Sequence, residues 1–434
     1  MHVLPQLEEL EKRFPDTLAV IGVHSQKFPA EAEPENLRQA ILRYDVRHPV
    51  VSDPDHVIWG QYAVSAWPTL VFVDPEGYHV GGHAGEFEAD AFAGYISEMV
   101  QSFDRQGKLN RTRLDLRLEV EKEPDRELKF PGKVLADAES GRLFIADTGH
   151  NRILLCDLAG GIIAVVGSGE SGTEDGGFEE ASFHFPQGMA LDGDLLYVAD
   201  TWNHLIRRVD FARRGVKTVA GTGDQARRHR RGGPARSTDL SSPWDLVFVQ
   251  GILYIAMAGS HQIWALDISG GEVHVFAGTG REALDDASLR KCALAQPSGL
   301  AFSGTRLYFA DSESSAIRFA DIETDKVETL VGAGLFEFGD RDGTGSEVRL
   351  QHCLGVAEHA GLLYVADTYN NKIKMIDPAT KTCLMLLGKR AALWEPGGLS
   401  ISGGKLYIAD TNNHAIRTAD LATLEVETLA IRAP

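Results

Sequence analysis

Cysteine is scarce in this chain of 434 residues, and its scarcity limits the chemistry that the chain can perform. The sequence holds no Cys-x-x-Cys pair, and its only cysteines are Cys156, Cys292, Cys353 and Cys383. Thiol exchange needs a low-pKa cysteine and usually a second one to resolve the intermediate. We therefore expect this chain to be redox-inactive. A reducing, cytoplasmic compartment is the default for such cysteine usage. For Cys353 and Cys383, which fall in one repeat unit, two buried thiols are favoured over a disulfide.

Other features that the sequence lacks argue against membrane, secreted and nucleic-acid-binding proteins. No run approaches the roughly 20 apolar residues that a membrane span needs, and Met1 is not followed by the basic and apolar regions of a secretory signal. The formal net charge of −19 argues against nucleic acid as the main partner, because neutralising phosphates requires clustered cations. We expect no nucleic-acid or membrane partner, and the sequence leaves the oligomeric state open.

What the sequence does contain is a repeat. Leucine, an aromatic residue, any residue, alanine and usually aspartate recur six times at a period of roughly 40–57 residues. Isoleucine follows six residues after the aspartate position in every copy, and aspartate four residues later. The copies begin at Leu143, Leu196, Leu253, Leu307, Leu363 and Leu406, and the aspartate position holds Asp147, Asp200, Met257, Asp311, Asp367 and Asp410.

Each copy predicts four short strands. In the fifth copy they are 353–357, 362–366, 373–376 and 382–387, with the apolar alternation of half-buried strands. One such sheet cannot bury its apolar face alone, whereas six packed radially can. The sequence therefore predicts a mainly β protein with a six-bladed β-propeller over residues 129–434. The loops that join the blades should emerge on one face of the disc, where functional loops concentrate.

A polar turn lies between the second and third strands of each copy, as in Asp-Thr-Trp-Asn-His at 200–204. Aspartate and asparagine side chains bond nearby backbone groups in tight turns. We expect Asp147, Asp200, Asp311, Asp367 and Asp410 to be structural, because six equivalent catalytic acids are implausible. Met257 lacks the oxygen that would tie the third turn, so a looser turn, or a partner from elsewhere, is expected there.

Histidines fill one position of this turn in three copies (His204, His261 and His414), and Asn151, Ser315 and Asn371 fill it in the others. Three histidines suggest a metal site, but asparagine and serine at the same position favour a role in the loop. We expect no catalytic residue, metal ligand or cofactor in this chain.

These repeats resemble NHL repeats, whose pattern includes Asp-Thr-x-Asn-x-x-Ile and a preceding Pro-x-Gly. Residues 186–188, 297–299 and 396–398 keep that prelude, whereas the third copy has Pro243-Trp244-Asp245 and the fifth has Gln351-His352-Cys353. The resemblance covers Phe130 to the C-terminus. It implies an NHL-type propeller, and since some NHL propellers carry a metal in the channel, a propeller hydrolase or lyase is one alternative.

The first 110 residues follow another pattern. Helices are predicted over 4–14, 35–44, 56–62 and 87–106, a buried strand over 18–23, and further strands over 69–73 and near 78–80. The segment 111–128 is interpreted as a linker with a possible extra strand, because Leu114, Leu116, Leu118 and Val120 alternate with polar residues. Alternating helices and strands suggest a small α/β domain.

That domain resembles the thioredoxin fold through Ala66-Trp67-Pro68-Thr69-Leu70. The resemblance gives Trp67, Pro68 and Thr69 the role of the cis-proline site, with a cis bond after Trp67. Together, both domains resemble the NHL repeat-containing protein 2 family, which carries Cys-x-x-Cys just before a segment like Met1–Pro5. We expect an incomplete, N-terminally shortened domain, since losing a central strand outright leaves neighbouring backbone groups unpaired.

One loop is basic although the net charge of the chain is negative. Its arginines could recognise an acidic partner or a phosphate, although a solvated loop is the simpler interpretation. They are Arg227, Arg228, Arg230, Arg231 and Arg236. For the whole chain we expect a non-catalytic binding or scaffold protein that takes a protein or peptide on the propeller face. The alternative is a thiol-disulfide oxidoreductase whose cysteines lie upstream, so the sequence leaves enzymatic activity open.

Overall fold

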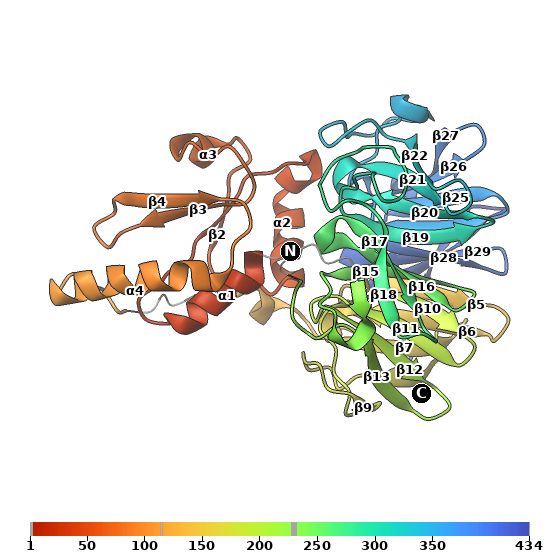
Figure 1. Ribbon diagram of the computed structural model, residues 1–434, viewed down its shortest axis with the longest axis horizontal. Helices are drawn as coiled ribbons and strands as arrows, with labels where there is room; N and C mark the ends of the chain where they lie inside the picture. The colour runs from red at the N-terminus through yellow and green to blue at the C-terminus, as the bar shows by residue number, and fades with distance from the viewer. Residues whose placement is uncertain (1–2, 113, 115, 227–231, 434) are drawn as a thin grey trace. The chain divides into compact units, whose positions relative to one another are not determined.

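The structure is a computed structural model that describes residues 3–112, 114, 116–226 and 232–433. The chain divides into two compact units, Met1–Asp125 and Arg126–Pro434. Figure 1 colours them from red to orange and from yellow to blue, respectively.

The first unit contains four α-helices and two separate two-stranded sheets among its described residues. β1 and β2 pair in parallel, whereas β3 and β4 pair antiparallel. The core lies between α1 and α4, where Leu10 and Ile96 are buried against Phe72 of β3. The elements are α1 (Val3–Arg13), β1 (Gly22–His24), α2 (Pro34–Arg43), β2 (Val50–Ser52), α3 (Val57–Gln61), β3 (Thr69–Val73), β4 (His79–Ala84) and α4 (Ala89–Arg105).

One sequence-based expectation for this unit is wrong. The strand expected over 18–23 is confined to β1, and Ile21 and Val23 are 60% and 44% exposed. Burial fails because β1 pairs only with β2 and the sheet ends there. The described part of 111–128 holds the 3-10 helix η2 (Glu119–Lys122) and no strand. The Arg38 guanidinium on α2 binds the carboxylates of Glu119 and Glu123, which ties this segment to a helix instead of a sheet edge.

The second unit is a six-bladed propeller, as the repeat predicts. Each blade is an antiparallel sheet of four consecutive strands. The first three blades are β5 (Lys133–Asp137), β6 (Arg142–Asp147), β7 (Arg152–Asp157) and β8 (Ile162–Val166); β10 (Pro186–Asp192), β11 (Leu195–Asp200), β12 (Leu205–Asp210) and β13 (Gly215–Ala220); and β15 (Pro243–Val249), β16 (Ile252–Met257), β17 (Gln262–Asp267) and β18 (Glu272–Ala277).

The last three blades repeat this order. They are β19 (Pro297–Ser303), β20 (Arg306–Asp311), β21 (Ala316–Asp321) and β22 (Lys326–Val331); β24 (Gly355–His359), β25 (Leu362–Asp367), β26 (Lys372–Asp377) and β27 (Thr382–Leu387); and β28 (Pro396–Ser402), β29 (Lys405–Asp410), β30 (Ala415–Asp420) and β31 (Val426–Leu429). The first strand of each blade contacts the first strand of the next, and β28 contacts β5, so the ring is closed.

The core consists of six apolar clusters, each shared by two neighbouring blades. Between blades 1 and 2, for example, Phe144 and Ile153 pack with Leu196 and Val198. The expectation of half-buried strands is wrong for the second strands, in which almost every residue is buried. A blade is covered by a neighbour on each side, so both faces of its sheet are removed from water.

Most blades receive an extra strand or bridge on their outer edge from the loop that precedes them. β9 (Gly176–Gly177) pairs with β13, β14 (Gly232–Pro234) with β18, and β23 (Gly343–Thr344) with β27, while Ala287 bridges Val327 of β22. Blade 1 receives this edge partner from the end of the chain. There the Ile162 N–H donates to the Arg432 carbonyl at 2.9 Å, and the Arg432 N–H donates to the Gly160 carbonyl at 3.0 Å.

Candidate functional site: the loop face and axis of the propeller

We define the loop face as the blade-connecting loops 168–183, the described part of 222–241, 279–296 and 333–350, together with the turns between the second and third strands. Both leave the same end of an antiparallel four-stranded sheet. Contacts join them directly, because the turn residue Asn203 donates to the Gly172 carbonyl and Asn370 donates to the Gly339 carbonyl, each at 2.6 Å.

The repeated turn aspartates are fully buried, and each ties down the chain that enters its own blade. In five blades one carboxylate oxygen accepts a backbone N–H at 2.7 Å. The donor and acceptor pairs are Lys129 and Asp147, His184 and Asp200, Ala295 and Asp311, Gln351 and Asp367, and Trp394 and Asp410. These contacts support a structural role for the aspartates, since a carboxylate committed to the backbone is removed from chemistry.

In five of the six blades the next turn residue connects the blade to its neighbour. The hydroxyl of Thr148 donates to the Pro186 carbonyl at 2.7 Å, and the hydroxyl of Thr411 donates to the Pro131 carbonyl at 2.9 Å, which joins blade 6 to blade 1. Thr201, Ser312 and Thr368 make the same kind of contact in blades 2, 4 and 5.

The histidine position makes a second link between blades. The side chain accepts a backbone N–H from the next blade in all six turns, at 2.7 to 3.1 Å. The acceptor and donor pairs are Asn151 and Phe185, His204 and Ser242, His261 and Gln296, Ser315 and His352, Asn371 and Glu395, and His414 and Phe130. The three histidines therefore act as Asn and Ser do, as the substitution pattern suggests. Among the described residues no group of three or more His, Cys, Asp or Glu is arranged to hold a metal ion.

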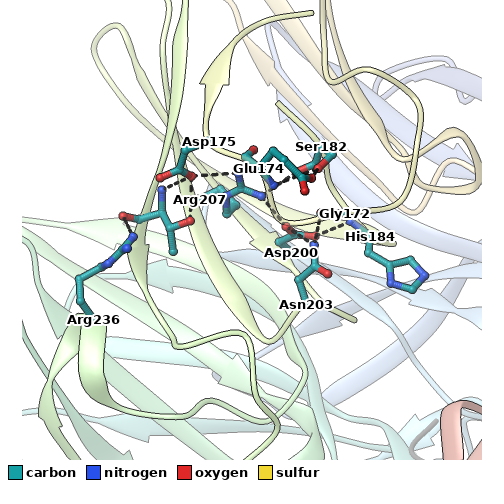
Figure 2. A network of polar contacts seen from close by, with 10 residues as sticks. Gly172, Glu174, Asp175, Ser182, His184, Asp200, Asn203, Arg207 and Arg236 are labelled. Carbon is teal, nitrogen blue, oxygen red and sulfur yellow. Dashed lines mark hydrogen bonds and ion pairs between the residues drawn. The ribbon is translucent and has the colours of Figure 1, made fainter. Parts of the chain in front are cut away.

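A buried cation completes the turn in blades 2 and 4, and the sequence analysis missed it. Arg207 is fully buried, and it donates to the Asp200 carboxylate at 2.9 Å and to the Ser182 carbonyl at 2.7 Å. Its second nitrogen reaches the preceding loop, at Asp175 and the Glu174 carbonyl. Figure 2 shows these contacts converging on Arg207. The guanidinium thus fixes a blade-connecting loop to the blade that follows it.

Arg318 repeats this arrangement in blade 4, with Asp311 at 2.8 Å and Asp286 of the preceding loop at 3.0 Å. In blade 5 the cation is Lys374, which binds Asp340 and Asp342 of its loop at 3.0 and 2.6 Å. The sequence did carry a signal, since Arg or Lys stands seven residues after the turn aspartate in blades 2, 4, 5 and 6.

Burial governs the protonation of these turn carboxylates. Desolvation raises the pKa of Asp200 to about 6, although the Arg207 charge and hydrogen bonds from Asn203 and the backbone oppose it. Desolvation also raises the pKa of Asp367 to about 7, against hydrogen bonds from Asn370 and the Gln351 N–H. The Asp311 and Asp410 pKa values shift upward for the same reason.

Blade 3 departs from this scheme without losing its turn. The Ser241 N–H donates to the Met257 sulfur at 3.3 Å, and His261 has the same left-handed backbone as its counterparts. The expectation of a looser turn is wrong, because the thioether supplies the acceptor. Ala258 stands at the threonine position, and Trp264 stands where other blades carry the buried cation.

The axis of the ring holds two charged residues that sequence reasoning missed. The Lys133 ammonium of blade 1 donates to the Asp245 carboxylate of blade 3 at 3.0 Å and to the Leu354 carbonyl, next to β24, at 2.7 Å. Both side chains are nearly buried. The departure at Pro243-Trp244-Asp245 was visible in the sequence, but its counterpart at Pro131-Gly132-Lys133 was not recognised.

All four cysteines are buried free thiols. Desolvation is the largest cause in each case, and it raises the pKa of Cys156 and Cys383 to about 12 and that of Cys292 to about 11. The Cys353 pKa also lies well above its usual value. Burial therefore keeps these thiols protonated and inert.

In the first unit the Trp67–Pro68 peptide bond is cis. The Trp67 indole N–H donates to the Ser25 carbonyl at 2.7 Å, and its ring lies 4.5 Å from that of Trp59. The Thr69 hydroxyl donates to the Ala66 carbonyl at 2.7 Å. Trp67 remains 48% exposed, so this cluster presents an aromatic surface.

The basic loop is only partly covered by the structure. Arg227, Arg228, Arg230 and Arg231 lie outside the described residues. Arg236 is exposed and donates to the Thr218 carbonyl at 2.5 Å. Over the part of the chain that the structure covers, no helix is long and apolar enough to cross a membrane.

Comparison with known proteins agrees with the repeat pattern. A model of the NHL repeat matches residues 183–208 and 393–418. The chain is 40% identical to NHL repeat-containing protein 2 of Gallus gallus and 41% identical to that of Homo sapiens, in both cases over 92% of this chain and 61% of the relative. It is 42% identical to Protein SUPPRESSOR OF QUENCHING 1, chloroplastic, of Arabidopsis thaliana, over 93% of this chain and 41% of that protein. The chain thus spans less than two thirds of these relatives.

Proposed function

We propose a binding function for this chain, which is an NHL-repeat protein related to NHL repeat-containing protein 2 along 92% of its own length. The propeller is a non-catalytic scaffold that presents the loop face to a protein or peptide. The observation that carries this proposal is the use of the repeated polar side chains. The turn aspartates and the histidines are taken up by backbone contacts within the ring, whereas the loops between blades vary freely in length and sequence.

Redox inactivity of this chain is part of the proposal. The sequence has no cysteine before Cys156, and all four thiols are buried with raised pKa values. A thiolate is the reactive species in exchange chemistry. An insulin-reduction assay with dithiothreitol as electron donor should give no rate above the uncatalysed background. A cysteine-dependent rate would overturn this part of the proposal.

The loop face is testable by site-specific photo-crosslinking. A photoreactive residue at Glu179 or Glu282 reports on this face. The matched controls are Glu139 and Glu323, which are also exposed but lie in the hairpin turns at the opposite end of their blades. We expect discrete protein adducts from the first pair only. Equal labelling from both pairs would contradict the assignment of the face.

Charge is the second property of the partner that can be tested. The arginines proposed as a contact for an acidic partner are Arg227, Arg228, Arg230, Arg231 and Arg236. Once a crosslinked partner has been identified, replacing all five by Ser should weaken its binding. The loss should shrink as salt is raised, because screening removes the ionic contribution. Unchanged affinity would exclude this loop as the contact.

A thiol-disulfide oxidoreductase is the second candidate. It is supported by the aromatic surface that the exposed Trp67 forms with Trp59, and by relatives whose matched part is 61% of their length. Under this hypothesis residues 1–110 form a thioredoxin-like domain, and the linker 111–128 joins this domain to the propeller at 129–434. The redox cysteines come from outside this chain. Insulin reduction by a longer protein, but not by this chain, would favour this candidate.

A cytoplasmic location for this chain is a prediction from its cysteine usage.

A further inference from the structure

The six blades place one equivalent residue each at the centre of the ring. This residue is the third of the Pro-x-Gly-like prelude at the start of each first strand. In the fifth blade the pairing of Gly355 with Ala366 places that prelude at Cys353-Leu354-Gly355, so the position expected from the sequence, Gln351-His352-Cys353, is wrong. In five blades it pairs in register with the repeated alanine of the second strand, and in blade 2 it lies in the irregularity between Pro186 and Met189. The six residues are Lys133, Gly188, Asp245, Gly299, Gly355 and Gly398.

Two of these six positions carry charge, and the two charges meet. The Lys133 ammonium lies 3.0 Å from the Asp245 carboxylate and 2.7 Å from the Leu354 carbonyl. The same Asp245 oxygen accepts the Leu300 N–H of blade 4 at 3.1 Å, and the other oxygen accepts the Leu246 N–H of its own strand at 2.9 Å. A side chain of blade 1 that reaches blades 3 and 5 must lie across the axis.

The glycines of the two remaining blades make room for this pair. A Cβ atom on Gly188 of blade 2 would lie 2.3 Å from the Asp245 Cα. A Cβ atom on Gly398 of blade 6 would lie 2.7 Å from the Lys133 Cα and 2.8 Å from its Cδ. Real Cβ atoms do not approach backbone that closely, so all six blades contribute to the surroundings of the ion pair.

We propose that Lys133 is the resident cation of the propeller axis. The Asp245 carboxylate and the Leu354 carbonyl form a cation-binding site, and the chain fills this site with its own ammonium group. These oxygens accept N–H donors from the ammonium group, and they carry the negative charge and dipole that attract a small cation. Because the Asp245 carboxylate is buried, a cation must occupy this site, since an uncompensated carboxylate away from water is strongly destabilising.

The proposal predicts chemical rescue. In Lys133→Gly, which has the residue that four other blades carry, Asp245 loses its counter-charge while a cavity of the side chain's length remains. We expect a fall in Tm of roughly 5–15 °C. Millimolar n-butylammonium should restore part of this loss, whereas tetramethylammonium at the same ionic strength should not, because it is bulky and has no N–H to donate. Rescue by K⁺ in place of the alkylammonium would equally support a cation site.

The matched control is Lys133→Gly/Asp245→Gly, which lacks the carboxylate and should not respond to any cation. Equal responses of the single and double variants would overturn the proposal. If Lys133→Gly does not fold, Lys133→Met keeps the length of the side chain and tests the same point. Adding Asp245→Asn to Lys133→Met should then raise Tm, because it removes the unpaired charge. If adding Asp245→Asn lowers Tm further, the two substitutions destabilise the protein independently, and the proposed site is refuted.

Discussion

The Met257 sulfur accepts the Ser241 N–H at 3.3 Å, at the position where a buried carboxylate oxygen accepts a backbone N–H in the other five blades. The cation position of the same blade holds Trp264, whose indole N–H donates to Gln262 at 3.0 Å. Carboxylate and cation are thus replaced together. This pairing is expected, because losing only one of them would leave a buried charge without a partner.

Blade 3 therefore predicts how blade 2 should respond to substitution. Arg207→Met leaves the Asp200 carboxylate buried and unpaired, and we expect it to lower the free energy of unfolding by about 3–5 kcal/mol. Asp200→Met/Arg207→Met recreates the sulfur acceptor of blade 3 without the charge, so its loss should be smaller. Urea unfolding followed by tryptophan fluorescence compares the two variants. A double variant that is less stable than the single one would contradict the pairing.

The link from each turn to the next blade predicts which replacements at His204 are tolerated. His204→Asn keeps an acceptor for the Ser242 N–H, as Asn151 and Asn371 do in their blades. His204→Leu leaves that N–H unsatisfied and should reduce the free energy of unfolding by about 1–3 kcal/mol. Thermal unfolding of both variants tests the prediction, and equal Tm values would show that the hydrogen bond is not what the turn requires.

Asp367 predicts a pH dependence with a defined sign. Its folded pKa is about 7 because of burial, against about 3.9 in an unfolded chain. The folded state therefore holds the extra proton between these values, so this stabilising contribution is present at low pH and is lost as pH rises toward 7. Asp367→Asn removes the titration. Relative to wild type, the stability of this variant should increase between pH 4 and pH 8, on the order of 2–4 kcal/mol.

Urea midpoints at pH 4.5, 6 and 8 would measure this difference between the variant and the wild type. The matched control is Asp377→Asn. The Asp377 pKa is lowered, chiefly by a hydrogen bond from the Ala379 N–H, so its stabilising contribution is lost as pH falls. An aspartate titrates at about 3.9 in an unfolded chain, so this contribution is constant between pH 4.5 and pH 8. Across that range the difference from wild type should change for Asp367→Asn and stay flat for Asp377→Asn. Parallel pH profiles would exclude titration of Asp367 in the folded state.

The burial of the four thiols predicts that they react slowly with thiol reagents. In native protein the four cysteines should not react with 5,5′-dithiobis(2-nitrobenzoate) on the timescale of minutes, because they are buried and protonated. All four should react once the chain is unfolded in guanidinium chloride. A thiol that reacts rapidly in the native protein would contradict the burial described for Cys156, Cys292, Cys353 and Cys383.

Close packing at the axis predicts that Gly188→Ala is costly, since the added methyl group would meet the Asp245 backbone. We expect a loss above about 2 kcal/mol in the free energy of unfolding. Gly94→Ala is the contrasting substitution. This glycine lies inside α4, and apart from its chain neighbours and the backbone of its own helix no atom lies within 4 Å of the added carbon. Alanine favours a helix by about 1 kcal/mol. Equal effects of the two substitutions on unfolding would contradict the tight axis.

The sequence predicts the propeller well because its signals are local and repeated six times. The outer strand Thr382–Leu387 and the turn at Asp367 follow directly from the alternation and the turn chemistry of one blade. Contacts across the ring leave no such signal. Lys133 and Asp245 are far apart in the chain, and although Asp245 replaces the glycine of the Pro-x-Gly prelude, nothing in its own blade indicates that Lys133 is its partner. The exposure of Ile21 could not be predicted either, because it depends on how few strands pair with β1.

At the outer edge of blade 1, the start of β8 is bridged by Arg432, which the ribosome adds only after the other five blades have been made. Until then the nascent chain carries an open strand edge that can pair with another polypeptide. Synthesis of this ring should therefore depend on chaperones, or on rapid completion of translation, more than the packed final state suggests. Any tag joined near Arg432 would need a spacer that leaves the bridge between Gly161 and Arg432 intact.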